Sequence, residues 1–413
     1  MEQTIDARRV AALADERLDW RFKAVPAAAH GLTAAEFLAG NPHLDELGTP
    51  LLTLDAAALD HNLRTMAAWC AAAGVGLAPH GKTTMAPALW QRQLEAGAEA
   101  ITLANLSQVR VARAFGVRRI HVANALLDPA GLRWIAGELD ADPGLSLTSW
   151  ADSVRTVELM SAALATAPGS RPLDVCVELG SPGGRTGART PDEALATARA
   201  VHAAPRLRLA GVSGYEGALA HDTAPESIAA VERYLRVLVV LHDRLREEGL
   251  LTGEAVLTAG GSAYFDTVVR VLAPAATGGT RVLLRSGAYL VHDDGFYRSV
   301  SPLAGAATPF RSAMHGWARV VSRPEPALAL LDCGKRDFPY DEGLPQPQSV
   351  PGRITALNDQ HAFLRDADAA VGDVVRLGLS HPCTAFDKWT LIPVLDDADA
   401  DRPNVVDLVR TFF

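Results

Sequence analysis

The sequence has few cysteines, no long apolar run and no excess of basic residues, and each absence excludes a class of protein. Its four cysteines are scattered over 413 residues without a CxxC pair, which is typical of reduced thiols and not of a disulfide framework. No stretch reaches the roughly 18 uninterrupted apolar residues of a membrane span. Basic residues number 39 against 48 acidic ones and form no long run, so we expect no nucleic-acid partner.

The chain also begins without the apolar core of a signal peptide. Its first twenty residues, MEQTIDARRVAALADERLDW, are charged throughout, and we therefore expect a cytoplasmic protein with no membrane partner. At 48% hydrophobic and 21% charged residues, the composition is that of an ordinary globular protein. The length allows one large domain and a smaller one.

Short apolar runs alternate with longer amphipathic stretches from Val75 to about Tyr289. The eight runs are VGLAP, EAITLA, RRIHVA, LSLTSW, LDVCVEL, LRLAGVSGY, EAVLTA and TRVLLRS. The stretches between them carry apolar residues at helical spacing and end near glycine, as βα units do. Eight consecutive units predict an α/β fold with a TIM (β/α)8 barrel rather than an open doubly wound sheet. The first glycine-rich turn also lacks the GxGxxG pattern of dinucleotide-binding folds.

The pattern changes after Tyr289 to strand-like stretches separated by turns, such as GDVVRLGLS and VVDLVRTFF. This predicts a C-terminal, mostly β domain. The run TPLLTLDAAALDHNLRTMAAWC, ahead of the first barrel strand, contains a strand and a helix of its own. We therefore expect an N-terminal segment at 1–70, part of which packs with the β domain, a barrel at 71–288 and the β domain at 289–413.

The residues that follow each barrel strand are expected to form a site, because TIM barrels keep their working residues at the C-terminal ends of the strands. The turns TAGGSAY and RSGAY bear glycine and offer free backbone N–H groups, which predicts a phosphate cradle. The alternative is that the Gly-Gly pair only makes a tight turn. The residues at these ends are His80, Lys82, Asn105, Asn124, Glu178, Arg185, Tyr215, Glu216, Gly260, Gly261, Ser262, Ser286 and Gly287.

Lys82 lies in the stretch GLAPHGKTTMA, directly after the first barrel strand. A lysine just past a strand is most often a solvated surface residue. Beside a phosphate cradle, a lysine can instead form a Schiff base with a phosphorylated aldehyde, since burial among apolar groups favours a neutral, nucleophilic amine. Pyridoxal 5′-phosphate is such an aldehyde.

Two motifs resemble those of a known family. APHGKTTMAP resembles the lysine motif of the alanine-racemase-like, fold-type III pyridoxal-phosphate enzymes, in particular the D-serine dehydratase and D-threonine aldolase group. GLSHPCTAFDKW resembles the His-x-Cys metal site of that group. The resemblance implies that Lys82 forms the Schiff base and that the protein is a homodimer. It places cofactor contacts at His80, Arg185, Tyr215, Gly260, Gly261, Ser262 and Gly287.

In this resemblance His381 and Cys383 match the zinc ligands of the dehydratases and, with a change at the second position in some members, the divalent-metal ligands of the aldolases. Residues two apart on an extended segment point the same way, and thiolate with imidazole suits zinc better than magnesium or calcium. Two protein ligands leave positions open for water and substrate. The alternative is a reduced cysteine beside a surface histidine. His292, Asp293 and Asp294 are further candidates for metal contacts or a hinge.

The expected activity is that of a pyridoxal-phosphate- and zinc-dependent lyase. It would convert a small D-3-hydroxy amino acid such as D-serine to a 2-oxo acid and ammonia. Lys82 would take the Cα proton and the metal would stabilise the departing oxygen. An aldolase that gives glycine and an aldehyde remains open, because the same site can break the Cα–Cβ bond. A non-catalytic cofactor-binding homologue is the third reading, although such proteins resemble the barrel alone.

Overall fold

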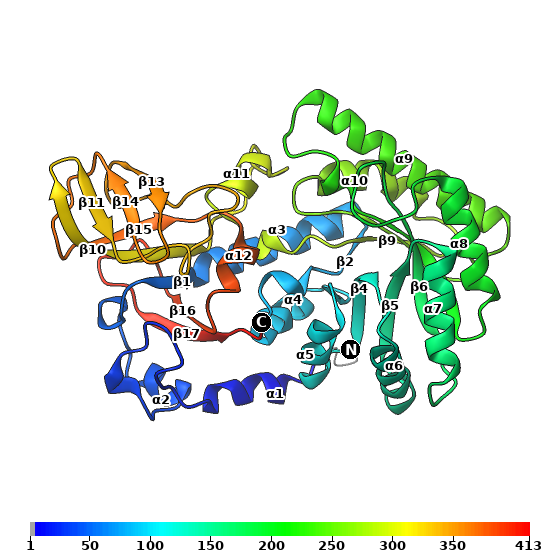
Figure 1. Cartoon of the computed structure of the whole chain (residues 1–413), viewed down its shortest axis with the longest axis horizontal. Coiled ribbons are helices and arrows are strands. Elements are labelled where there is room, and N and C mark those ends of the chain that lie inside the picture. The colour runs from blue at the N-terminus through cyan, green and yellow to red at the C-terminus, as the bar shows by residue number, and fades with distance from the viewer. Residues whose placement is uncertain (1–4) are drawn as a thin grey trace. The chain divides into compact units, whose positions relative to one another are not determined.

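The structure is a computed structural model that describes residues 5–413. The chain divides into two compact units, each assembled from segments that are distant in the sequence (Figure 1). The first unit contains Ala67–Lys82 and Gln93–Gly287, with Ile5 and Asp6. The second contains Ala7–Met66, Thr83–Arg92 and Ala288–Phe413.

The first unit is built on an eight-stranded parallel sheet in the order β2-β9-β8-β7-β6-β5-β4-β3. Its two ends meet beyond β2, where His80 forms a parallel bridge with Thr102 and the N–H of Thr102 donates to the carbonyl of Pro79 at 2.9 Å. The predicted α/β barrel is confirmed. Its strands are β2 (Gly76–Leu77), β3 (Ile101–Leu103), β4 (Arg119–Ala125), β5 (Ser146–Ala151), β6 (Leu173–Leu179), β7 (Leu207–Gly214), β8 (Ala255–Thr258) and β9 (Thr280–Leu284).

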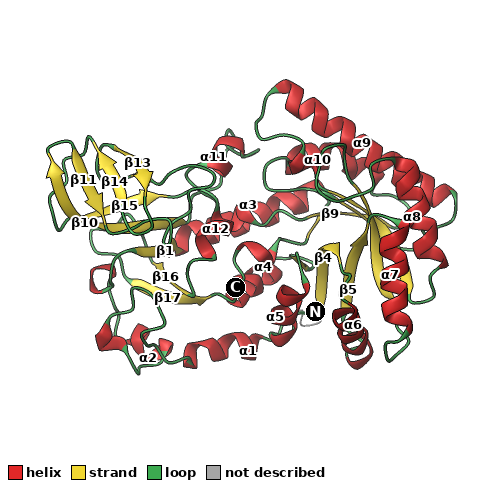
Figure 2. Ribbon diagram, in the orientation of Figure 1, coloured by secondary structure: helices red, strands yellow, loops and turns green. Residues whose placement is uncertain are grey.

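The helices of the first unit pack on the outside of these strands (Figure 2). Most begin at a capping side chain: Thr190 and Glu193 form a reciprocal capping box with Pro191 as the first helical residue of α8, which satisfies the free N–H groups of the first turn. The helices are α5 (Leu106–Ala114), α6 (Pro129–Ala141), α7 (Val154–Ala165), α8 (Pro191–Ala203), α9 (Pro225–Glu247) and α10 (Phe265–Leu272).

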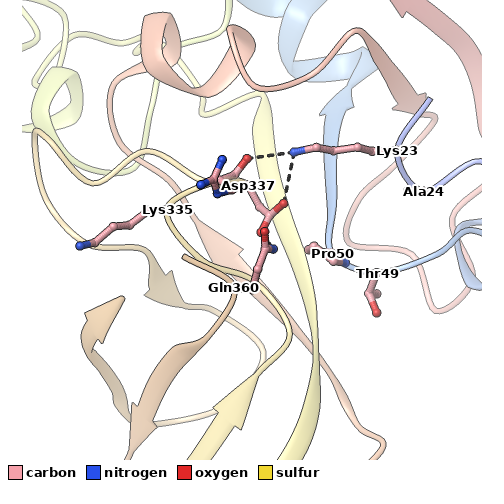
Figure 3. A pocket seen from close by; sticks show the side chains of 8 residues that line it. Lys23, Ala24, Thr49, Pro50, Lys335, Asp337 and Gln360 are labelled. Atoms are coloured by element: carbon pink, nitrogen blue, oxygen red, sulfur yellow. Dashed lines mark hydrogen bonds and ion pairs between the residues drawn. The ribbon is translucent and has the colours of Figure 1, made fainter. Parts of the chain in front are cut away.

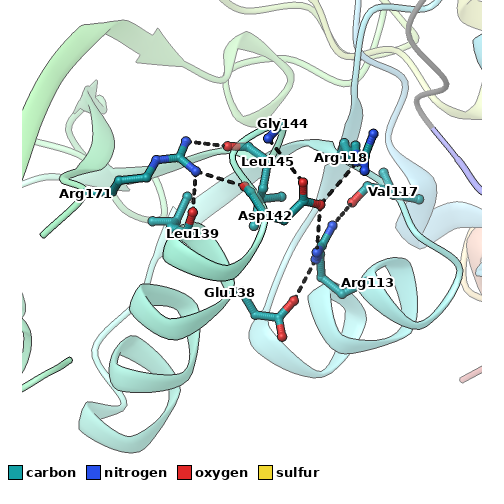
Figure 4. A network of polar contacts seen from close by, with 9 residues as sticks. All are labelled: Arg113, Val117, Arg118, Glu138, Leu139, Asp142, Gly144, Leu145 and Arg171. Carbon is teal, nitrogen blue, oxygen red and sulfur yellow. Dashed lines mark hydrogen bonds and ion pairs between the residues drawn. The ribbon is translucent and has the colours of Figure 1, made fainter. Parts of the chain in front are cut away.

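A polar network closes the C-terminal end of α6 (Figure 4). One oxygen of Asp142 lies 3.1 Å from Arg113 and 3.2 Å from Arg118, and the other accepts the N–H of Gly144 at 3.1 Å. Arg171 donates to the carbonyls of Asp142 and Leu145 at 2.9 and 2.8 Å. These contacts join α5, α6 and the starts of β4, β5 and β6 at the N-terminal side of the barrel.

The second unit is built on a nine-stranded mixed sheet, which confirms the predicted mostly β C-terminal domain. Strand β1 (Leu51–Asp55) lies within this sheet, antiparallel to β10 and parallel to β16. The order is β13-β14-β11-β10-β1-β16-β17, and β15 pairs with β10 and β12. The other strands are β10 (Met314–Glu325), β11 (Leu328–Leu331), β12 (Gln346–Pro347), β13 (Arg353–Leu357), β14 (Ala362–Arg365), β15 (Val374–Gly378), β16 (Leu391–Leu395) and β17 (Val405–Arg410).

The second unit has four short helices, and two longer ones contribute residues to both units. No helix in the described part of the chain is long and apolar enough to cross a bilayer. The short helices are α1 (Ala7–Ala11), α2 (Ala34–Ala39), α11 (Phe296–Val300) and α12 (Pro382–Phe386), and the longer ones are α3 (Ala56–Ala73) and α4 (Pro87–Glu95).

Helix α12 corrects one expectation. The segment around His381 and Cys383 is not extended: Pro382 is the first residue of α12, Cys383 lies in its first turn, and His381 precedes it with φ 53° in the left-handed region. Proline is favoured at the first helical position because its fixed φ suits a helix and its missing N–H is not needed there.

Candidate functional site

Three cationic side chains surround His80 at the C-terminal end of the barrel. The pKa of His80 lies well below its usual range, mainly because the side chain is buried. Nearby charges, which include those of Lys82, Arg285 and Arg185, lower it further. Its Nδ1 is buried and makes no hydrogen bond within residues 5–413. Lys82 itself is half-buried in the short turn Gly81–Thr83. This end of the barrel is therefore electropositive and suited to an anion.

Lys82 is set apart from the other lysines by its position. The chain contains four lysines, Lys23, Lys82, Lys335 and Lys388, and Lys82 is the one that belongs to the first unit. The turn after β9 packs closely beside it, since a Cβ added at Gly287 would lie 2.6 Å from the carbonyl oxygen of His80. The first and the eighth predicted strand ends thus meet.

The turn after β8 is occupied by a carboxylate. The N–H groups of Gly260 and Gly261 donate to the two oxygens of Glu216 at 2.9 and 2.6 Å. Gly260 has φ +102°, a conformation that favours glycine. The hydroxyl of Ser286 donates to the carbonyl of Gly261 at 2.8 Å. The donors predicted for a phosphate are present, but within the protein they already bind Glu216.

Side chains from the neighbouring strand ends gather beside that turn. The guanidinium of Arg185 lies 4.6 Å from the centre of the Tyr215 ring, and a Cβ at Gly261 would lie 3.1 Å from the same ring. The hydroxyl of Thr186 donates to Glu178 at 2.8 Å, while burial raises the pKa of Glu178. The structure therefore brings together predicted residues from four strand ends.

Two predicted residues at this end have structural roles. The side chain of Asn105 caps α5 by accepting the N–H of Gln108 at 3.1 Å. The amide of Asn124 donates to the carbonyl of Ala104 at 3.4 Å. Both side chains satisfy nearby backbone groups, as polar residues at strand and helix ends commonly do.

Arg285 is a buried residue that the sequence reasoning missed. It is 4% exposed and donates to the hydroxyl of Thr258 at 2.5 Å and the carbonyl of Gly214 at 2.6 Å. Its guanidinium lies 4.9 Å from the centre of the Trp150 ring. Burial lowers its pKa, and the Glu216 carboxylate is the first charge that opposes this. An arginine within the apolar run TRVLLRS was the available signal.

The second unit holds the His-x-Cys motif. Nδ1 of His381 lies 2.6 Å from a carboxylate oxygen of Asp341, whose other oxygen accepts the hydroxyl of Thr384 at 2.8 Å. A hydrogen bond with Cys383, and then the Asp341 carboxylate, raise the pKa of His381 to about 9. The thiol of Cys383 lies 3.5 Å from the hydroxyl of Thr83, the residue that follows Lys82 in the chain.

The three candidates in YLVHDDGFY serve packing and backbone support. Asp293 is fully buried and accepts four backbone N–H groups, including that of His381 at 2.9 Å, and burial raises its pKa to about 6. Asp294 accepts the amide of Gln348 at 3.0 Å. The ring of His292 lies 5.7 Å from that of Phe310, and burial lowers its pKa to about 4.

The donor chemistry at His381 fits a divalent metal only in part. Within residues 5–413, no group of three or more His, Cys, Asp and Glu side chains comes together to hold an ion. The pair His381 and Cys383 nevertheless offers an imidazole and a thiol, and Cys383 is near enough to raise the pKa of His381. Asp341 on Nδ1 leaves Nε2 as the nitrogen available to a metal, as in the carboxylate–histidine pairs of metal sites.

The largest of the described cavities do not coincide with the predicted site residues at the C-terminal end of the barrel. A cavity of about 660 Å³ in the second unit is bordered by Lys23, Asp337 and Gln360, and no predicted site residue lines it (Figure 3). Another of about 540 Å³ opens among the N-terminal ends of the barrel strands around His121. The cavity lined by Arg185 and other residues of the C-terminal end measures only about 20 Å³.

Comparison with known proteins decides the family. Residues 54–271, more than half of the chain, match the alanine racemase N-terminal domain, and residues 313–395 match a putative serine dehydratase domain. The chain belongs to the fold-type III pyridoxal-phosphate enzymes. It is 31% identical over 366 residues to a D-threonine aldolase of Arthrobacter sp, and the matched region covers 87% of this chain and 91% of the relative.

One further relative and two solved structures extend the comparison for this fold-type III enzyme. A 3-hydroxy-D-aspartate aldolase of Paracoccus denitrificans is 28% identical over 82% of this chain and 87% of its own. The crystal structure of D-threonine aldolase from Filomicrobium marinum has a TM-score of 0.77 at 27% identity, over 90% of this chain and 97% of the other. D-threo-3-hydroxyaspartate dehydratase from Delftia sp. HT23, at a TM-score of 0.72 and 23% identity over 89% and 98%, shares the fold.

The residues at the barrel end fit the cofactor of the family. An orphaned, buried nitrogen on His80, the cations Lys82, Arg185 and Arg285 around it, and a turn at Gly287 too close for a side chain together suit a flat, anionic aldehyde. Lys82 is the lysine expected to provide the amine.

Proposed function

We propose that this protein is a pyridoxal-phosphate-dependent lyase that acts on D-3-hydroxy amino acids. The observation that carries the proposal is the contact of Cys383 with Thr83 in the second unit, because Thr83 directly follows Lys82. Within the second unit, a candidate metal ligand thereby contacts the residue that follows the lysine in the chain. The named activities of the relatives, aldolases of D-threonine and 3-hydroxy-D-aspartate, support the same substrate class.

Lys82 has two roles in this proposal. When bound, pyridoxal phosphate withdraws electrons from the Cα of an amino acid and so weakens the bonds to that carbon. Lys82 would hold the cofactor, and its amine, once released by the substrate, would take or return the proton at Cα. The cations Arg185 and Arg285 would offset the negative charges of cofactor and substrate at this end of the barrel.

His381 and Cys383 would hold a divalent metal. The soft thiol donor favours zinc, and a metal would supply Lewis acidity to the β-oxygen of the substrate. Asp341 would keep the imidazole in the orientation that exposes Nε2, and Asp293 would fix the backbone of His381 through its N–H. One solved D-threo-3-hydroxyaspartate dehydratase is a Cys-to-Ala variant in a metal-free form, which supports a metal in that relative.

Two reactions remain candidates for the same site. Loss of water from the substrate is favoured by the His-x-Cys motif, whose thiol and imidazole suit a metal that stabilises a departing oxygen. Cleavage of the Cα–Cβ bond is favoured at least as strongly by the relatives, since those at 31% and 28% identity are named aldolases. The bond that breaks depends on which one stands perpendicular to the cofactor plane.

Product analysis separates the candidates. Purified protein supplied with pyridoxal phosphate and zinc would be incubated with D-serine, D-threonine and D-3-hydroxyaspartate. Pyruvate from D-serine identifies dehydration, whereas glycine and acetaldehyde from D-threonine identify aldol cleavage. Lys82→Ala is the matched control and should form neither product. If the wild-type protein binds the cofactor but converts none of the three, it is a non-catalytic homologue and the proposal is wrong.

A further inference from the structure

Glu216 lies beneath the glycine turn after β8 and is fully buried, with 0% of its surface exposed. Its Oε2 accepts the N–H of Gly260 at 2.9 Å and its Oε1 accepts the N–H of Gly261 at 2.6 Å. We propose that Glu216 is a positioning residue: it holds the glycine turn in place, and the cofactor's phosphate binds to the groups that this turn presents rather than to these two N–H groups. The inference rests on the proposed function.

A phosphate does not replace Glu216 on this turn. Displacement would leave a buried carboxylate without its two donors, which costs the full desolvation of a charged group. It would also place two anions side by side in the barrel end, where like charges repel strongly. The two short hydrogen bonds to a charged acceptor are of the strong class. Glu216 therefore belongs to the architecture of the turn.

The turn has little freedom to adopt another shape. A Cβ at Gly260 would lie 2.6 Å from Cδ2 of Leu284, and one at Gly261 would lie 3.1 Å from the Tyr215 ring and 3.4 Å from Oε1 of Glu216. The turn is thus enclosed by β9 on one side and by the segment that carries Tyr215 and Glu216 on the other. Loss of the carboxylate would remove the two hydrogen bonds that hold the turn on the side of Tyr215 and Glu216.

The glycine turn after β8 also contacts the turn after β9. The carbonyl of Gly261 accepts the hydroxyl of Ser286 at 2.8 Å, and Ser286 directly precedes Gly287. A chain of contacts therefore runs from Glu216 through Gly261 to the turn after β9. Both glycine turns that flank the predicted phosphate site depend on the same carboxylate.

The Glu216 carboxylate also interacts electrostatically with Arg285. This arginine is 4% exposed, burial lowers its pKa, and the charge of Glu216 is the first that opposes the effect. A substitution at Glu216 could therefore act through charge as well as through the turn. The two effects can be separated by their sign, because loss of a negative charge would favour the anionic phosphate whereas loss of the turn would disfavour it.

The test compares two ligands that differ in the phosphate alone. Dissociation constants of pyridoxal phosphate and of pyridoxal would be measured on the cofactor-free protein by absorbance titration, for the wild type and for Glu216→Gln. The glutamine keeps the size of the side chain but replaces one acceptor by a donor that faces a glycine N–H. The dissociation constant of pyridoxal divided by that of pyridoxal phosphate reports the contribution of the phosphate. We expect this ratio to fall ~10-fold or more in Glu216→Gln, while the affinity for pyridoxal itself changes much less.

Two further variants keep the test decisive. Glu138→Gln removes a carboxylate at the N-terminal side of the barrel, one that lies 2.9 Å from Arg113, and should leave the ratio unchanged. If Glu216→Gln does not fold by circular dichroism, Glu216→Asp retains the charge but is too short to reach both N–H groups, and should give an intermediate ratio.

The outcomes are distinct. An unchanged ratio in the Glu216 variants overturns the positioning role, and a higher ratio shows instead that Glu216 competes with the phosphate for the turn. If the wild-type protein binds neither ligand, the proposed function fails and the role of Glu216 fails with it.

Discussion

Gly287→Ala is the perturbation for which the structure gives the clearest magnitude. The added Cβ would lie 2.6, 2.9 and 3.0 Å from the carbonyl oxygen, Cβ and nitrogen of His80, all well inside van der Waals contact. Because two of these atoms are backbone, the turn that leads to Lys82 must move. Overpacking of this kind costs about 1–3 kcal/mol of unfolding free energy.

Urea unfolding followed by circular dichroism measures that cost, and Gly137→Ala is the matched control. Gly137 lies in α6, and a Cβ there would have no atom within 4 Å. Replacing a helical glycine by alanine should stabilise the protein by about 0.5–1 kcal/mol. The two substitutions are therefore expected to differ in sign, and Gly287→Ala should also weaken cofactor binding. A Gly287→Ala variant as stable as the wild type would refute the packing argument.

Two more predictions concern other parts of the chain. Asp142→Asn should lower the unfolding free energy by about 1–2 kcal/mol, because it weakens charged hydrogen bonds to Arg113 and Arg118 (Figure 4). Burial alone would raise the pKa of Asp142, but the two arginines hold it below its usual 3.8. The folded-state pKa is thus depressed, so the difference between variant and wild type in urea titrations should be constant above about pH 5 and shrink as the pH falls below 3.8; a difference that does not shrink as the pH is lowered below 3.8 would contradict this. Cys383→Ala should retain bound cofactor and should still exchange the Cα proton of D-serine for deuterium, as followed by NMR, while product formation stops. Cys70→Ala is the matched control, in which another cysteine is replaced. Product formed at the wild-type rate by metal-free Cys383→Ala would show that the motif is only a turn.

The barrel could be predicted from the sequence because its signals are local. Each apolar run is a few residues long and is followed by turn residues, and Lys82 lies within three residues of the first of them. The strand β1 was also visible as the run TPLLTLD. These features require no knowledge of which distant residues meet.

The role of Glu216 could not be predicted, since its partners Gly260 and Gly261 are 44 and 45 residues away in the sequence. The glycine pair alone suggested free N–H groups. Similarly, Arg285 finds Gly214 only after β7 and β9 are placed in the sheet.

The conformation of His381 was mispredicted although a signal was present. Pro382 is typical of a first helical residue, but the spacing of His381 and Cys383 was interpreted as an extended segment. The backbone instead passes through a left-handed residue, His381, into the first turn of α12, which contains Cys383. Asp341, which orients His381 from 40 residues away, had no local signal.

We expect Lys82 to carry the cofactor, and covalent trapping can identify the lysine that does so. Protein loaded with pyridoxal phosphate would be reduced with borohydride, digested and analysed by mass spectrometry, with Lys388→Ala as the matched control. With only four lysines in the chain, each can be assigned. We predict a single phosphopyridoxyl group on Lys82 in the wild type and in Lys388→Ala, and none in Lys82→Ala. A phosphopyridoxyl group on Lys23, Lys335 or Lys388 in place of Lys82 would show that the assignment is wrong.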